Sequence, residues 1–361
     1  MNQLLSKAYI LGLRAMGERR RITLAVFLLA AVSLSMSVWL GATATATHVP
    51  GGHLAAVGPV NAQTHFAEWY EDSNGLQLKL CINDAFLCIN DPVDPGNALS
   101  VESGFGAEAF WWAADAHMPV GTGGSALLVL AVEAAYANDD PEANAQMSFG
   151  RIRVRASGLV PGASYRVIHP YGEKDYVAEA GAVSIRDTID IGCLGVIPGA
   201  VACDWNLARL SNVGPFLVWD PAVAPEAPPG AIGNPAVEHK VIGSPFGTNH
   251  FRIEGLNAGG PGVNFAQTDL FLVQGKLFDN PPTAVNDAVN IPVGSTARPI
   301  DVLANDSDRD GNTITVSAVT QPASGAVAIE AGAGRVIFTP GAAGSQTFNY
   351  TASSTMPGNP T

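Results

Sequence analysis

Three aspartates alternate along one short stretch of the chain and could hold a divalent cation. Asp306, Asp308 and Asp310 are each separated by one residue, and Gly311 follows them. Carboxylate oxygens are hard ligands, so at this spacing they can converge on one Ca²⁺ while the glycine allows the tight bend. The stretch is not an EF-hand, since the twelfth position counted from Asp306 is Ser317 and not a bidentate glutamate. A plain Asp- and Gly-rich turn between strands remains the alternative.

The residues around this loop resemble a known module. Four motifs carry the resemblance: P-x-A-x-N-D at 282–287, V-L-A-N-D-x-D-x-D-G at 302–311, T-P at 339–340 and F-x-Y-T at 348–351. Together they are similar to the cadherin-like, VCBS-type Ig-fold repeat of bacterial surface adhesins, over about residues 281–361. The resemblance implies a β-sandwich and, as in many members, a bound calcium ion. It also implies that Asn286 and Asp287 reach the same site as the three aspartates.

The end of the chain departs from this pattern. Repeats of this kind usually continue past F-x-Y-T into a further strand, whereas this sequence stops at Thr361. We therefore expect a truncated module, or one that a partner completes, because an uncompleted sheet edge is a pairing hazard.

The four cysteines point to two local disulfides, although three pairings are formally open. Residues 76–82 alternate between apolar and polar side chains, so we expect a strand there with 86–89 as its return. That hairpin places Cys81 opposite Cys88, close to disulfide reach. The remaining pair, Cys193 and Cys203, closes a short loop rich in Gly and Pro. Zinc is not expected, because it needs C-x-x-C spacing or nearby histidines, which the sequence lacks.

A second candidate site combines aromatic rings with a carboxylate. Trp111 and Trp112 could stack on the faces of a sugar, and Glu108 could hold its hydroxyl groups. The alternative is that both tryptophans are core residues. This aromatic stretch lies in residues 104–118, whose alanines favour a helix while its aromatic residues favour a strand.

The short signatures of common enzymes are missing from the sequence. It contains no G-x-S-x-G, H-E-x-x-H, G-x-G-x-x-G or Walker motif, and its seven histidines are scattered. We therefore expect a protein that is not an enzyme. A secreted carbohydrate-active or other hydrolytic enzyme, with its catalytic domain in 62–278, remains the alternative, because paired carboxylates need no short motif.

The first residues are typical of an export signal. Five basic residues between Lys7 and Arg21 precede an uncharged run at 22–40, and small residues follow at 41–46. This order predicts a signal helix that is cleaved after Ala46. An uncleaved membrane anchor is the alternative, because the run of 19 residues can just span the hydrocarbon core.

Composition restricts the class of protein and of partner. The chain has 361 residues, of which 47% are hydrophobic and 14% charged, and its net charge is −13. The charged fraction lies below the ~25% of average domains, which excludes a long coiled coil or a charge-driven disordered chain. The acidic balance excludes nucleic acid as a partner, because phosphate binding needs a basic surface. A membrane is expected as a partner only through an uncleaved N-terminal segment.

The elements that position these residues are expected to be short strands. Residues 126–136 form an apolar run typical of a buried central strand. Residues 149–156 alternate, with Ile152 and Val154 inward and three arginines outward. The stretch L-x-P-G-x-x-Y that ends at Tyr165 resembles fibronectin type III-like sandwiches, in which the tyrosine bonds back to the backbone.

These patterns predict an all-β protein of β-sandwich domains, Ig-like or fibronectin-like, behind an N-terminal signal helix. Its expected parts are a signal peptide or signal anchor at 1–46, a flexible mature N-terminus at 47–61, a β-sandwich of unknown function at 62–278 (one domain or two) and the cadherin-like module at 279–361. The predicted function is that of a secreted or cell-surface bacterial protein in adhesion, matrix contact or structural display. Calcium is the expected cofactor, and the expected partners are a surface glycan or protein ligand and further Ig-like repeats.

Overall fold

The computed structural model describes residues 54–195, 203–292, 294–332 and 334–356. The predicted signal helix, its cleavage site after Ala46 and the residues before Leu54 lie outside this part of the chain. The described residues form many strands and few helical turns, which confirms the all-β prediction. They include no helix that is long and apolar enough to cross a membrane.

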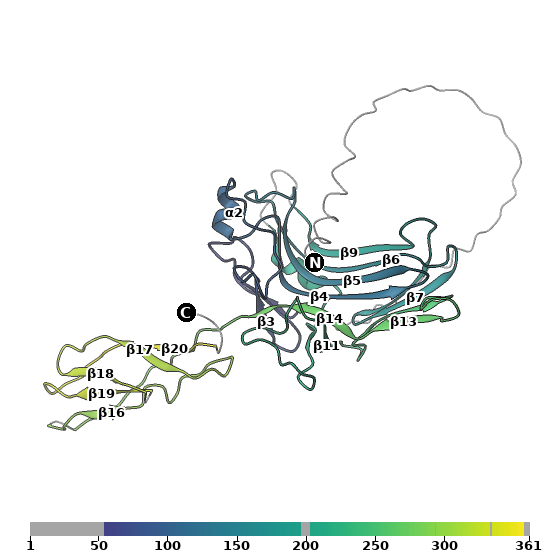
Figure 1. Ribbon diagram of the computed structural model, residues 1–361. Coiled ribbons are helices and arrows are strands. Elements are labelled where there is room, and N and C mark those ends of the chain that lie inside the picture. Colours follow the sequence, from purple (N-terminus) through teal and green to yellow (C-terminus); the bar gives the residue numbers. More distant parts are fainter. Residues whose placement is uncertain (1–53, 196–202, 293, 333, 357–361) are drawn as a thin grey trace, which may run out of the picture. The chain divides into compact units, whose positions relative to one another are not determined.

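The largest sheet has seven antiparallel strands in the order β10-β11-β14-β4-β5-β6-β9 (Figure 1). Its strands are β4 Glu108–Val120, β5 Gly124–Tyr136, β6 Gln146–Ala156, β9 Ile185–Cys193, β10 Val218–Trp219, β11 His239–Ile242 and β14 Leu270–Gln274. The apolar run predicted as a central strand is β5, which pairs with β4 on one side and β6 on the other.

Two four-stranded sheets and two short helices accompany it. One sheet has the order β1-β2-β3-β15 and the other β13-β12-β7-β8. The strands are β1 Ala56–Val57, β2 Trp69–Glu71, β3 Gln77–Lys79, β7 Ser164–His169, β8 Gly172–Val177, β12 Phe251–Gly255, β13 Phe265–Thr268 and β15 Lys276–Leu277. The helices are α2 Ala98–Ser103 and the 3₁₀ helix η2 Trp205–Leu210.

Side-chain alternation explains how the sheets bury one shared core. On β6, Ile152 and Val154 are buried while the three arginines lie half-buried on the other face, as predicted. The ambiguous stretch before Met118 forms strand β4, and a bulge between Phe110 and Trp112 interrupts its register. Side chains from all three sheets then meet in a single hydrophobic core.

The three sheets that share this core are called the larger region below. Tyr165 closes one of its corners. The Val160 N–H donates to the Tyr165 hydroxyl at 2.9 Å, and this hydroxyl donates to the Leu256 carbonyl at 2.6 Å. The ring is 1% exposed. The bond back to the backbone that the fibronectin-like stretch predicted is therefore present, and it links the start of β7 to the end of β12.

The C-terminal region has two small sheets and a core of its own. The sheets are β16-β19-β18 and β17-β20, with strands β16 Arg298–Ile300, β17 Thr315–Val319, β18 Ala326–Glu330, β19 Arg335–Thr339 and β20 Tyr350–Ser353. Four valines and Phe338 make up its buried core: Val302, Val316, Val327 and Val336 besides the phenylalanine. A small Ig-like β-sandwich results.

Both predicted disulfides are present, Cys81–Cys88 and Cys193–Cys203. The hairpin predicted for the first pair is wrong. Strand β3 is short, Cys81 pairs with Phe110 of β4, and the Cys88 N–H donates to the Asp84 carbonyl inside a compact turn. The turn, and not a second strand, brings the two sulfur atoms together.

Candidate functional site

The first group of predicted calcium ligands surrounds the Tyr350 hydroxyl, where β20 begins. That hydroxyl lies 3.0 Å from each carboxylate oxygen of Asp306 and 3.2 Å from the Val285 carbonyl oxygen. It also hydrogen bonds the Asp287 carboxylate. Asp306 Oδ1 accepts from the Val285 N–H at 2.8 Å, and the Asn286 carbonyl accepts from the Asn305 side chain at 3.3 Å. Three separate segments thus place oxygen atoms around one point.

The second group of predicted ligands consists of Asp308 and Asp310, whose carboxylates accept several hydrogen bonds each. Asp308 Oδ1 accepts from the backbone N–H groups of Asp310 and Asn312 at 2.9 and 3.0 Å, and its Oδ2 accepts from the Ser354 hydroxyl at 2.6 Å. Asp310 accepts from the backbone and side-chain nitrogens of Asn280 at 2.6 and 2.9 Å. Asp308 therefore organises its own turn, whereas Asp310 connects that turn to Asn280.

The electrostatics of the first group favour a cation. Partial desolvation, and next the negative charge of Asp306, raise the pKa of Asp287. Burial and the bond to Asp306 raise the pKa of the Tyr350 hydroxyl above its usual range. Within the described residues, no Lys or Arg forms an ion pair with either aspartate. The same residues contain no group of three or more His, Cys, Asp or Glu side chains that could hold a metal ion, so the arrangement rests on two carboxylates and neutral oxygens.

The candidate sugar site is not assembled in the structure. Trp111 and Trp112 are both 0% exposed, and their indole N–H groups donate to the Ala67 and Leu217 carbonyls at 2.9 and 3.1 Å. Neither ring presents a face to solvent, so the stacking role predicted for them is corrected to a core role. Glu108 instead approaches an arginine of β6.

The sequence patterns did not indicate the charged network on β4, β5, β6 and β9. Arg151 donates to both carboxylate oxygens of Asp190 at 2.8 Å each, and its Nη1 lies 2.8 Å from Glu133 and 3.7 Å from Glu108. Burial, and next the hydrogen bond that the protonated Glu133 donates to Glu108, raise the pKa of the Glu133 carboxyl well above its usual range. One signal was available, because Glu133 is a lone acid inside the apolar run 126–136.

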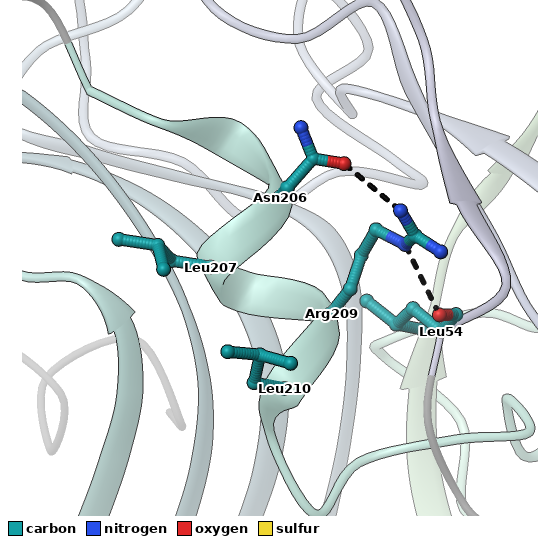
Figure 2. A pocket seen from close by; sticks show the side chains of 5 residues that line it. All are labelled: Leu54, Asn206, Leu207, Arg209 and Leu210. Carbon is teal, nitrogen blue, oxygen red and sulfur yellow. Dashed lines mark hydrogen bonds between the residues drawn. The ribbon is translucent and has the colours of Figure 1, made fainter.

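A shallow apolar pocket lies beside η2, as Figure 2 shows. Its volume is about 310 Å³, and its lining consists of Leu54, Asn206, Leu207, Arg209 and Leu210. The Arg209 guanidinium donates to the Asn206 side chain at 2.9 Å and to the Leu54 carbonyl at 3.4 Å. These bonds tie the start of the described chain to the helix.

Comparison with known proteins identifies the C-terminal region. Residues 279–358 match the family model of the bacterial Ig domain, which confirms the bacterial Ig-like repeat predicted there. No curated protein and no solved structure matches the chain. A bacterial Ig domain indicates a surface or extracellular protein module. The two disulfides are consistent with that location, because disulfides persist in oxidising compartments.

Proposed function

We propose that this protein acts outside the cytoplasm in adhesion or structural display, without catalysis, and that its bacterial Ig repeat is stiffened by a calcium ion held by Asp287 and Asp306. The observation that carries the proposal is the oxygen cluster around Tyr350. A single hydroxyl proton can be donated fully to only one acceptor at a time. Apart from that proton, the oxygen atoms of the cluster accept only from the neutral Val285 N–H and the Asn305 side chain, so no positive charge balances the two carboxylates, and a cation would supply it.

The chemistry of the donor set fits calcium. Ca²⁺ takes about 6–8 oxygen ligands from carboxylates, backbone carbonyls and water. The two carboxylates, together with the Val285 carbonyl, supply donors of this kind, and Asp287 is exposed so that water can complete the set. The ligand set proposed here is narrower than the predicted one, because Asp308 already accepts hydrogen bonds within its own turn and Asp310 accepts from Asn280.

Stiffening follows from where the ligands lie in the chain. Asp287 precedes β16, Asp306 lies between β16 and β17, and Tyr350 opens β20. A cation that binds only the folded arrangement stabilises it by mass action. Among the described residues of the repeat, five hydrophobic side chains form the buried core, so such a cross-link would add to the rigidity of a small module.

The larger region suits the role of a rigid scaffold. Its sheets share one core, and the hydrogen bonds of the buried Tyr165 and Trp111 side chains fix a corner and the bulged central strand. Glu108 and Glu133 share a hydrogen bond, whereas glycosidase carboxylates stand about 5–9.5 Å apart. This pair does not support the hydrolase alternative. A surface glycan or protein is the ligand class we propose for its loops.

The experiment compares host cells that display the full chain, on plates coated with extracellular matrix proteins or with bacterial exopolysaccharide. We expect adhesion in calcium and its loss in chelator or in the double variant Asp287→Asn/Asp306→Asn. Glu330→Gln is the matched control, because it removes an acid from a half-exposed ion pair of the same repeat, away from the proposed ligands. Adhesion no greater than that of cells without the protein would contradict the adhesive role. Adhesion that is unchanged in chelator and in the double variant would contradict the calcium site.

A further inference from the structure

Arg155 of β6 and Arg186 of β9 lie directly opposite each other on neighbouring strands (Figure 1). Arg153, two residues before Arg155, lies on the same face of the sheet. Like charges in directly opposed positions destabilise a sheet. The grouping is unexpected in a chain of net charge −13, in which only 19 of 361 residues are Lys or Arg. These three residues are called the arginine cluster.

The charges of the arginine cluster are not compensated. Within the described residues, none of its members forms an ion pair. Arg153 donates only a long bond, 3.3 Å, from Nε to the neutral Thr188 hydroxyl. Burial, and next the charges of Arg151 and Arg155, lower the pKa of Arg153. The Arg155 Nε is buried and has no hydrogen-bond partner in the described part of the chain, which costs stability.

The acids on the same face are engaged elsewhere. Three of them surround Arg151: Asp190, Glu133 and Glu108. Asp115 lies closer to the cluster, because Asp115 and Arg153 are both paired with Val129 of β5. Burial raises the pKa of Asp115 to about 7, so at neutral pH this carboxyl carries only part of a negative charge. The end of the face with Arg155 and Arg186 is therefore positive.

The remaining acids near this end do not neutralise it. Asp187 follows Arg186 along β9, but it points to the opposite face and accepts from Lys174 at 2.8 Å. The charge of Glu238 acts on His117, at the other side of β5. Glu179, in the turn before β9, is exposed and forms no ion pair in the part of the chain that the structure describes. The uncompensated charge calls for an anion from outside the chain.

The surface under the arginine cluster favours a polymer that is held through side chains. Strand β6 pairs with β5 on one side and with β9 on the other, so its backbone groups are already bonded. Peptides that bind to sheets instead use the unpaired backbone of an edge. Beside the cluster, the half-buried Leu127 and Val129 of β5 form an apolar floor. A chain of sugar rings can lie on such a floor and present acidic groups to the guanidinium groups.

We propose that the arginine cluster binds the carboxylate groups of an acidic polysaccharide. The inference rests on the proposed function, of which it specifies the glycan ligand. A guanidinium group matches a carboxylate through two parallel hydrogen bonds. Arg153 and Arg155 follow each other along one face of a strand, and Arg186 extends the row to the next strand, so successive charges of one polymer can be bound together. The contact requires no calcium and should weaken as salt is added.

The test measures binding of the purified full chain to immobilised polygalacturonate by biolayer interferometry, in chelator, with neutral dextran as the uncharged polymer. We expect the wild type to bind polygalacturonate and not dextran, and Arg155→Gln/Arg186→Gln to bind at least about tenfold more weakly. The matched control is Arg166→Gln/Arg298→Gln, which removes the same charge from exposed positions on β7 and β16. We expect the control to bind like the wild type.

Thermal unfolding of the same variants tests whether the cluster serves the fold. Because the substitutions remove repulsion between opposed charges, the melting temperature of Arg155→Gln/Arg186→Gln should equal or exceed that of the wild type. A clear fall in its melting temperature would assign the arginines a structural role and contradict the proposal.

Three binding results would overturn the proposal. They are no binding of the wild type to polygalacturonate, equal weakening in both double variants, and tighter binding to poly-glutamate, which would assign the cluster to an acidic peptide. The measurement uses neither cells nor calcium. Its failure would therefore leave the calcium site and adhesion through another ligand untouched, and failure of the adhesion experiment would not remove binding to the purified polymer.

Discussion

The Tyr350 hydroxyl lies 3.0 Å from both carboxylate oxygens of Asp306, although 43 residues separate the two in the sequence. The same carboxylate accepts from the Val285 N–H, so it joins the first segment of the bacterial Ig repeat to its last strand. A short polar cluster thus holds together a module whose hydrophobic core is small. Removing the Tyr350 hydroxyl should therefore show how much this cluster contributes to the stability of the repeat.

We expect Tyr350→Phe to lower the free energy of unfolding of the repeat by about 1.5–3 kcal/mol in chelator, which is typical of a lost hydrogen bond to a charged group. With calcium present the loss should shrink, because the cation replaces the missing positive partner of Asp306. Urea denaturation of the full chain in both conditions measures the two losses. Equal losses with calcium and with chelator would contradict a shared site.

Tyr165→Phe should destabilise the larger region. The substitution leaves the Val160 N–H and the Leu256 carbonyl, which meet the hydroxyl at a half-buried corner, without their shared partner. An unsatisfied buried polar group costs about 1–3 kcal/mol, so the urea midpoint should fall without a change in slope. An unchanged midpoint would show that water replaces the hydroxyl at this corner.

Removing the Cys81–Cys88 disulfide should lower the free energy of unfolding by about 2–3 kcal/mol, the range expected for a loop of this length. The double variant Cys81→Ala/Cys88→Ala, compared with the wild type by thermal unfolding, measures it. Because Asp84 still caps the turn, native circular dichroism should be kept. A variant that is as stable as the wild type would contradict this prediction.

Glu133 should make stability fall as pH rises. In the unfolded chain its carboxyl loses a proton near its usual pKa of 4.5, whereas burial and then Glu108 keep it protonated to higher pH in the folded state. Between these pKa values the folded state binds the extra proton, so the free energy of unfolding decreases with increasing pH. Glu133→Gln carries no titratable proton and should flatten this decrease between about pH 5 and 8.

Melting temperatures across this pH range test the Glu133 prediction. Arg151 keeps its bidentate pair with Asp190 in the variant, so its charge remains compensated. Glu173→Gln on the exposed face of β8 is the control and should leave the pH slope unchanged. A slope that is identical in wild type and Glu133→Gln would contradict the assignment.

Local patterns predicted the strands well where burial is one-sided. The alternation at 149–156 and the apolar run at 126–136 identified β6 and β5, since side-chain period follows directly from which face is buried. Residues 104–118 stayed ambiguous because propensities conflict there. Burial of Trp111 and Trp112 against distant segments decided for a strand, and such contacts leave no local signal.

The sequence predicted which residues belong to the candidate site, but it did not predict how their side chains are arranged. The alternating aspartates and the resemblance marked the right loop, yet Asp306 turns toward Tyr350 while Asp308 and Asp310 bind their own backbone and Asn280. Which donor reaches which carboxylate depends on strand pairing between distant segments. The predicted disulfide pairs were correct because cysteines close in sequence are brought together by either a hairpin or a turn. The Cys81–Cys88 bond therefore forms although a turn replaces the expected hairpin.

The most direct test of the proposed calcium site is the melting temperature of the full chain with calcium and with chelator, for wild type, Asp287→Asn/Asp306→Asn and Glu330→Gln. A cation that binds only the folded state raises the midpoint by mass action. We predict a calcium-dependent rise for wild type and Glu330→Gln, and none for the double variant. A midpoint that calcium does not move in the wild type, or that calcium raises equally in the double variant, would contradict a calcium ion held by Asp287 and Asp306.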